Sequence, residues 1–197
     1  MEFNILYVRS IELDMNSITF RPAIPSDHVR IASLHTESWR SSYRGILPDA
    51  YLDEEITEER ERLWKARFLT PDIDRRYMLL AEIKKELVGF VCVLLDEEPE
   101  WGACLDNLHV CPELKGQGLG RQLFAKATRW VMAKELGWPI HLWVFEANHP
   151  ARRFYEALRG EVVEREIKEM PGGAKVPSLR YVWRDLGMLL NDLTFKD

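Results

Sequence analysis

Three glycines occur at every second position near the middle of the chain, at Gly116, Gly118 and Gly120, with Lys115 before them and Arg121 after them. Glycine has no Cβ and therefore lets a ligand approach the backbone closely. If a helix begins in this loop, its first turn has unpaired N–H groups and a partial positive charge, which together favour an anion. The spacing and the flanking cations therefore predict a site for a phosphate group.

The segments on either side of the glycines supply the elements that such a site needs. The apolar-rich run over 103–110 predicts a strand, and Pro112 ends it because proline has no N–H for a strand ladder. From Leu119 onward, apolar residues recur every three or four positions, which predicts an amphipathic helix. The alternative at this point is a glycine-rich turn that binds no ligand.

Two common phosphate loops do not fit this segment. A dinucleotide fingerprint needs G-x-G-x-x-G, and Arg121 stands where the third glycine should be, while the chain has no Walker run G-x-x-x-x-G-K-[ST]. The run Lys-Gly-Gln-Gly-Leu-Gly at 115–120 instead resembles the Q/R-x-x-G-x-G/A signature of the GNAT superfamily of N-acetyltransferases. This resemblance implies that the loop binds the pyrophosphate of coenzyme A. Lys115 replaces the usual Gln or Arg, which keeps a donor but loses the planar fork or amide.

A second segment, from Leu142 to Glu156, resembles the same family's pattern L-x-V-x-x-x-N-x-x-A-x-x-F-Y-E. The resemblance implies that Asn148 hydrogen-bonds the pantetheine arm and that Tyr155 reaches its sulfur. It also implies that the backbone of the strand before the glycines pairs with the pantetheine amides, as an added strand would. The cofactor-binding residues implied in this way are Leu108, His109, Val110, Lys115, Gly116, Gln117, Gly118, Leu119, Gly120, Arg121 and Asn148.

Acetyl transfer to an amine requires an oxyanion site, an acid and a base. Backbone N–H groups near His109 and Val110 can stabilise the oxyanion, and Tyr155, as a phenol, can protonate the departing thiolate. Asp106 can deprotonate the amine through water, and His109, with a pKa near neutral, is the other candidate base. The alternatives are a core tyrosine at 155, a hydrogen-bonded carboxylate at 106 and a packing role for the histidine.

The acceptor site is expected, by the resemblance, at the first helix and its following turn, together with the loop of the last strand pair. The candidates are Trp39, Tyr43 and Arg44, and the loop over 170–177. Trp39 and Tyr43 lie at i and i+4, a spacing that equally suits packing in the core or at a rim.

Along the whole chain, the predicted order of elements is β-α-α-β-β-β-α-β-α-β-β, with one strand–helix–strand crossover over 103–145. This order predicts an α/β protein with a mixed sheet. It resembles the GNAT (acyl-CoA N-acyltransferase) fold, in which the fourth and fifth strands of the mixed central sheet splay apart. The resemblance covers residues 18–183, so residues 1–17 are expected to be an N-terminal extension and 184–197 a C-terminal tail without an assigned element.

Composition narrows the classes of protein further. The formal net charge of -5 argues against a nucleic-acid partner. No apolar run reaches about 18 residues, so no membrane span is expected, and the first residues do not resemble a signal peptide. The three cysteines form no CxxC pair and the histidines show no zinc spacing, which favours reduced thiols, a cytoplasmic location and no metal.

The sequence therefore predicts an acetyl-CoA-dependent N-acetyltransferase that acts by direct attack of a primary amine, on a small molecule or a polypeptide. A non-catalytic acyl-CoA sensor on the same fold is the first alternative, and a protein that binds another phosphorylated ligand is the second. Asn148 and Tyr155 together favour the enzyme. The sequence leaves the acceptor, and the formation of a homodimer, open.

Overall fold

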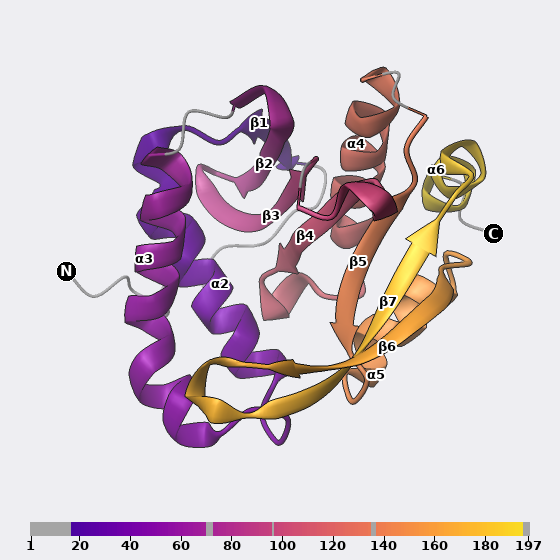
Figure 1. The fold of residues 1–197 in the computed structure, drawn as a ribbon. Coiled ribbons are helices and arrows are strands. Elements are labelled where there is room, and N and C mark those ends of the chain that lie inside the picture. The colour runs from indigo at the N-terminus through magenta and orange to yellow at the C-terminus, as the bar shows by residue number, and fades with distance from the viewer. Residues whose placement is uncertain (1–16, 70–72, 96, 135–136, 195–197) are drawn as a thin grey trace.

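The computed structural model describes residues 17–69, 73–95, 97–134 and 137–194, and its strands form a single mixed sheet (Figure 1). The order across the sheet is β1-β2-β3-β4-β5-β7-β6, and β4–β5 is its parallel pair. The strands are β1 (Thr19–Pro22), β2 (Arg76–Ile83), β3 (Glu86–Leu94), β4 (Ala103–Val110), β5 (Ile140–Phe145), β6 (Glu161–Glu169) and β7 (Lys175–Trp183). The mixed α/β sheet predicted from the sequence is confirmed, and β4 and β5 have the predicted bounds.

Helices cover both faces of this sheet. They are α2 (His28–Ser42), α3 (Ile56–Leu69), α4 (Leu119–Ala133), α5 (His149–Glu156) and α6 (Leu186–Thr194). Neighbouring residues of β3 mark the two faces, because successive side chains of a strand point in opposite directions. A Cβ on Gly89 would contact Leu119 and Leu123 of α4, whereas Phe90 packs edge-to-face on Trp64 of α3. Within the described ranges, no helix is long and apolar enough to cross a membrane.

The parallel pair β4–β5 is joined over a short distance only. Its register consists of Ala103 opposite Ile140 and Cys104 opposite His141. Beyond these two pairs the strands separate, so the predicted splay of the fourth and fifth strands is present. The edge of β4 that faces β5 therefore lacks a neighbouring strand along most of its length.

A β-bulge interrupts β4 next to the point of separation. Asn107 pairs with Cys92 and Leu105 pairs with Val93, so Asp106 is the extra residue on β4. A bulge bends its strand and redirects the inserted side chain. Asp106 thus stands where β4 begins to turn away from β5.

The chain after Arg184, to which the sequence assigned no element, contains α6. Leu189 and Leu193 of this helix are buried in the main core, and α6 packs along α4. The apolar pattern of this segment is short. The helix is buried because it packs on α4, and the local sequence does not reveal that contact.

The last two strands form a ribbon that reaches the lower ends of α2 and α3 (Figure 1). There the ribbon packs on a short helical turn, η3 (Tyr51–Glu55), and a second apolar core forms between them. A Cβ on Gly172, at the tip of the ribbon, would lie 2.9 Å from Cβ of Tyr51. The buried members of this core are Trp39, Leu47, Tyr51, Leu52, Ile56 and Val176.

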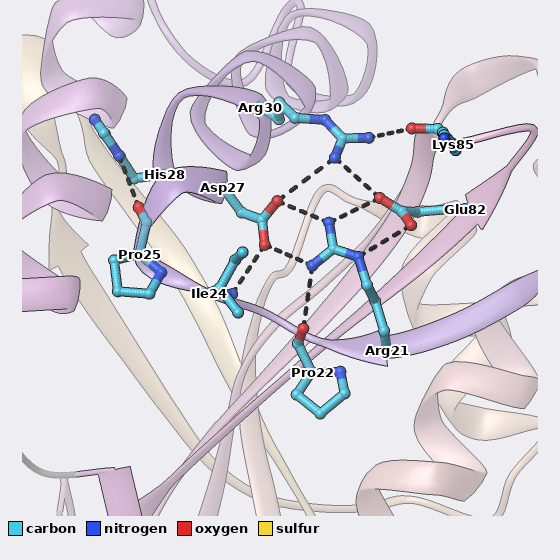
Figure 2. A network of polar contacts seen from close by, with 9 residues as sticks. All are labelled: Arg21, Pro22, Ile24, Pro25, Asp27, His28, Arg30, Glu82 and Lys85. Atoms are coloured by element: carbon cyan, nitrogen blue, oxygen red, sulfur yellow. Dashed lines mark hydrogen bonds and ion pairs between the residues drawn. The ribbon is translucent and has the colours of Figure 1, made fainter.

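A charged network fastens β1 to α2 and β2 (Figure 2). The guanidinium of Arg21 donates to both carboxylate oxygens of Asp27, at 2.7 and 2.8 Å, and to both oxygens of Glu82, at 2.9 and 3.0 Å. Arg30 also donates to Glu82, at 2.9 Å, and Asp27 accepts the backbone N–H of Ile24. The side chain of Asp27 is 4% exposed, so its charge depends on these partners.

We expect Arg21→Ala to lower the free energy of unfolding by about 2 kcal/mol, because it leaves the buried carboxylate of Asp27 poorly compensated. The hydrogen bond from Arg21 lowers the pKa of Asp27, so this stability is present above the ordinary carboxyl pKa and is lost as pH falls through the lower folded pKa. Urea unfolding at neutral and acid pH would measure both effects. The control is Arg62→Ala, whose side chain is 70% exposed and should change stability little. Equal losses of unfolding free energy in the two variants would contradict the stabilising role assigned to the ion pair of Arg21 with Asp27.

Candidate active site

A cavity of about 610 Å³ lies where β4 and β5 separate. Residues of α2, β4, the glycine loop, β5 and α5 line it, so elements far apart in sequence meet there. Of the residues predicted to form the site, those that line it are Tyr43, Asp106, Leu108, His109, Val110, Lys115, Gly116, Gly118, Gly120, Arg121, Asn148 and Tyr155.

The backbone of β4 offers polar groups to this cavity. The N–H of Cys111 donates to the carbonyl of Val88 on β3, at 2.9 Å. Because backbone groups alternate in direction along a strand, those of Val110 and Leu108 point away from β3 and towards the gap. This edge of β4 can therefore bind an extended ligand as a neighbouring strand would.

The glycine loop has the geometry of an anion site. Gly116 and Gly118 have φ values of 79° and 89°, in the left-handed region that glycine tolerates best, and Gly118 is the N-cap of α4. Apart from the glycine itself and its two chain neighbours, no described residue has an atom within 4 Å of a Cβ placed on either glycine. The first turn of α4 thus presents its N–H groups to open space at the mouth of the cavity.

The two cations that flank the glycines each have a partner. Lys115 Nζ donates to Ser42 Oγ on α2 at 3.0 Å, and burial lowers the pKa of this lysine. Arg121 donates to the carbonyl of Asp192 on α6. The C-terminal helix therefore positions one side chain of the predicted phosphate site.

Helix α5 places Asn148 and Tyr155 on the opposite wall of the cavity. Asn148 is the N-cap, and its Oδ1 accepts the N–H of Ala151 at 3.3 Å, which leaves its amide nitrogen for a ligand. The ring of Tyr155 packs against Phe154, while its hydroxyl has no hydrogen-bond partner among the described residues. Burial raises the pKa of Tyr155, and the neighbouring Tyr43 raises it further. The phenol is consequently protonated at neutral pH.

Asp106 lines the cavity from the bulge of β4. Its Oδ2 lies 2.5 Å from Arg67 Nη1 and accepts from the side chain of Asn107. In the part of the chain that the structure describes, Oδ1 has no partner. Arg67 thus anchors one oxygen of the carboxylate, and the other oxygen can accept a proton or a hydrogen bond.

A model of the acetyltransferase (GNAT) family matches residues 31–160, more than half of the chain. The chain belongs to this family. The match contains the glycine loop and the segment of Asn148 and Tyr155, and it includes most of α2 and all of β4 and α5, which together line the cavity.

Relatives of this acetyltransferase match it along most of their length. The Bacillus subtilis N-acetyltransferase YuaI is 29% identical over 174 residues, which cover 87% of this chain and 96% of that protein. The PaiA N-acetyltransferase of Thermoplasma acidophilum, solved with coenzyme A, shares the fold at 21% identity with a TM-score of 0.64, covering 82% of this chain and 98% of the other. YncA of Salmonella typhimurium, solved with acetyl-CoA, gives 18% identity and a TM-score of 0.60, with coverages of 86% and 95%.

His109 of the acetyltransferase is poorly suited to act as a base. Burial, and to a smaller extent the positive charges of Lys115 and Arg60, lower the pKa of its imidazole to about 3. The ring is therefore neutral across the physiological range and holds an added proton weakly. Its Nδ1 shares a hydrogen bond of 2.8 Å with Ser38 Oγ. Asp106 remains the better candidate of the two.

Four predicted site residues do not line the cavity. Gln117 turns back and donates to the carbonyl of Glu113, and the side chain of Leu119 is fully buried in the core. Trp39 packs in the second core, and the guanidinium carbon of Arg60 lies 4.3 Å from the centroid of the Trp39 ring. The remaining residue is Arg44.

Arg44 is held on the surface by two carboxylates, those of Asp49 and Asp53. Of the three predicted acceptor residues, Tyr43 therefore lines the cavity and its two companions do not. Burial raises the pKa of Tyr43 to about 12, so it too is a neutral phenol at this wall.

The sequence interpretation missed three serines of α2 that line the cavity, Ser38, Ser41 and Ser42. Their spacing of three and four places them on one helix face, a signal that the sequence does contain. Trp143 of β5 also lines the cavity.

In the described ranges of the acetyltransferase, no group of three or more His, Cys, Asp or Glu side chains could hold a metal ion. Cys92, Cys104 and Cys111 are buried and unpaired, and burial raises the pKa of Cys111 to about 11. A thiol in that state is a poor nucleophile.

Proposed function

We propose that this acetyltransferase uses acetyl-CoA to acetylate a primary amine of a small molecule or polypeptide by direct attack. One observation carries the proposal: a continuous cavity leads from the glycine loop, along the unpaired edge of β4, to the free hydroxyl of Tyr155. Along the cavity, the anion site of the glycine loop comes first, the edge of β4 second and the Tyr155 hydroxyl third. The pyrophosphate, the pantetheine arm and the thioester follow one another in the same order in acetyl-CoA.

The residues present fit that coenzyme. The N–H groups at the start of α4 would bind the pyrophosphate, with Lys115 and Arg121 at the rim. Backbone groups of Leu108 and Val110 would pair with the pantetheine amides, and the amide nitrogen of Asn148 would donate to the same arm. The backbone of Gly116, Gln117, Gly118, Leu119 and Gly120 would form the loop around the pyrophosphate.

The chemistry then assigns roles to three groups of the chain. As the amine attacks the thioester, a C–N bond forms and an oxyanion develops, which a backbone N–H at Val110 or Leu108 can stabilise. When the C–S bond breaks, Tyr155 donates its proton to the leaving thiolate. Oδ1 of Asp106 removes the proton of the amine through water. Tyr43 borders the acceptor side of the cavity.

The test is release of free thiol from acetyl-CoA in the presence of a broad panel of primary amines, with binding of coenzyme A measured by calorimetry. We expect binding, and thiol release that depends on an added amine. Tight binding of coenzyme A without turnover across the panel would contradict the enzyme and support an acyl-CoA sensor. No binding of coenzyme A would contradict both.

A further inference from the structure

A hydroxyl of α2 and an imidazole of β4 meet at the wall of the cavity, and the reaction outlined above uses neither side chain. Ser38 Oγ lies 2.8 Å from His109 Nδ1, and both residues line the cavity. Ser38 is 3% exposed, so its orientation is set by the protein and not by bulk water. The pair joins the helix on the acceptor side to the strand whose edge faces β5.

The surroundings of His109 fix this pair in one arrangement. Its ring lies 4.5 Å from the ring of His35 and 5.3 Å from that of Phe90. The Nε1–H of Trp64 donates to Nδ1 of His35 at 3.0 Å, which places the proton of neutral His35 on its other nitrogen. Burial keeps both imidazoles uncharged, because it lowers the pKa of each. The packing of these rings therefore holds the neutral imidazole of His109 in place as the hydrogen-bonding partner of Ser38.

Ser38 keeps a free acceptor site in either tautomer of His109. If Nδ1 accepts the hydroxyl proton, both lone pairs of Oγ remain, and if Nδ1 donates, one lone pair remains. An amine that enters the cavity can give an N–H to this oxygen. Because that bond stops the amine from rotating, it can direct the nitrogen lone pair towards an electrophile.

We propose that Ser38 binds and orients the acceptor amine, and that His109 is the positioning residue that holds the hydroxyl in place. This inference rests on the proposed acetyl transfer and names the group that recognises the amine. No proton passes to His109, since a buried imidazolium is disfavoured there. Ser38 accepts a hydrogen bond from the neutral amine, while the acid and the base stay as assigned above.

Ser38→Ala tests the proposal. We expect kcat/KM for the amine to fall on the order of 10-fold, the effect of one lost hydrogen bond in the reacting complex. The affinity for coenzyme A and the melting temperature should change little. Ser38→Thr keeps the hydroxyl and should recover most of the activity, which a purely structural role of the serine would not require.

The control is Thr36→Val, an isosteric removal of another buried hydroxyl from the same helix. Thr36 does not line the cavity, and its Oγ1 has no hydrogen-bond partner within the described residues. Its loss should change kcat/KM by less than about 2-fold. Combining Ser38→Ala with His109→Phe should cost no more than the larger single change, since both remove one interaction.

The possible results separate this inference from the function on which it rests. If wild-type protein transfers acetyl to no amine, the proposed function fails and the inference falls with it. If wild type is active and Ser38→Ala matches it, the inference alone is overturned. Additive losses in the double variant would overturn the positioning role of His109.

Discussion

Tyr155→Phe should lower kcat on the order of 10²-fold while the affinity for coenzyme A and the melting temperature change little. The variant keeps the ring, which packs against Phe154, Tyr181 and Trp183, and removes only the hydroxyl. That hydroxyl has no partner among the described residues, so its removal leaves no buried group unsatisfied. Steady-state kinetics with a responsive amine, calorimetry and a thermal melt would measure the three quantities.

The matched variant is Asp106→Asn, which removes the proposed base and keeps the size of the side chain. It should lower kcat/KM most on the acid side of the pH profile, where deprotonated amine is scarce. Tyr155→Phe should leave the shape of that side in place, because the raised pKa keeps the phenol protonated throughout. Wild-type kcat in Tyr155→Phe would exclude the general-acid role and leave the fold and the glycine-loop site untouched.

Gly120→Val should weaken the binding of coenzyme A by about 10²-fold, because a branched side chain would displace a phosphate from one or two charge-assisted backbone hydrogen bonds. In the protein without ligand, a Cβ at this position would have Phe154 as its nearest contact, at 3.9 Å. The variant should therefore fold, and a thermal melt would verify it. Gly118 is a poorer choice, since its φ of 89° would strain any other residue.

Lys115→Ala provides the comparison for Gly120→Val. A partly exposed charge is screened by water and salt, so its loss should weaken binding by only a few-fold and less at high ionic strength. Unchanged affinity in folded Gly120→Val would contradict the assignment of the loop to the pyrophosphate.

The parts of the fold that the sequence predicted well are those whose signals are local. The strand before the glycines and the start of α4 are marked by apolar periodicity, Pro112 and Gly118 within a few residues. The turn between β2 and β3 is equally local, and Lys84 and Lys85 adopt the left-handed conformation there without a glycine. Local chemistry is enough for such elements because the apolar pattern and the residue that ends it lie within a few positions of each other.

Outside the two motifs, the sequence could not show which of the predicted residues reach the cavity. Arg67 anchors Asp106 from α3, which a reading of β4 alone could not reveal. Trp39 and Tyr43 share one helix face, yet the ribbon of β6 and β7 buries the first and leaves the second at the cavity. Arg44 was expected at the acceptor, and two nearby aspartates hold it on the surface instead. Long-range contacts decide each of these outcomes.

The width of the cavity depends on contacts at its two ends. At one end, two residue pairs hold β4 to β5. Towards the other end, Phe145 of β5 packs on Tyr43, the residue that follows α2, with 4.8 Å between ring centroids, and the tip of the ribbon rests on Tyr51. The sheet thus consists of two parts, and the contacts that set their separation take no part in the proposed acid–base chemistry. Repacking of the ribbon could therefore change which acceptors fit, while every residue that performs the chemistry stays the same.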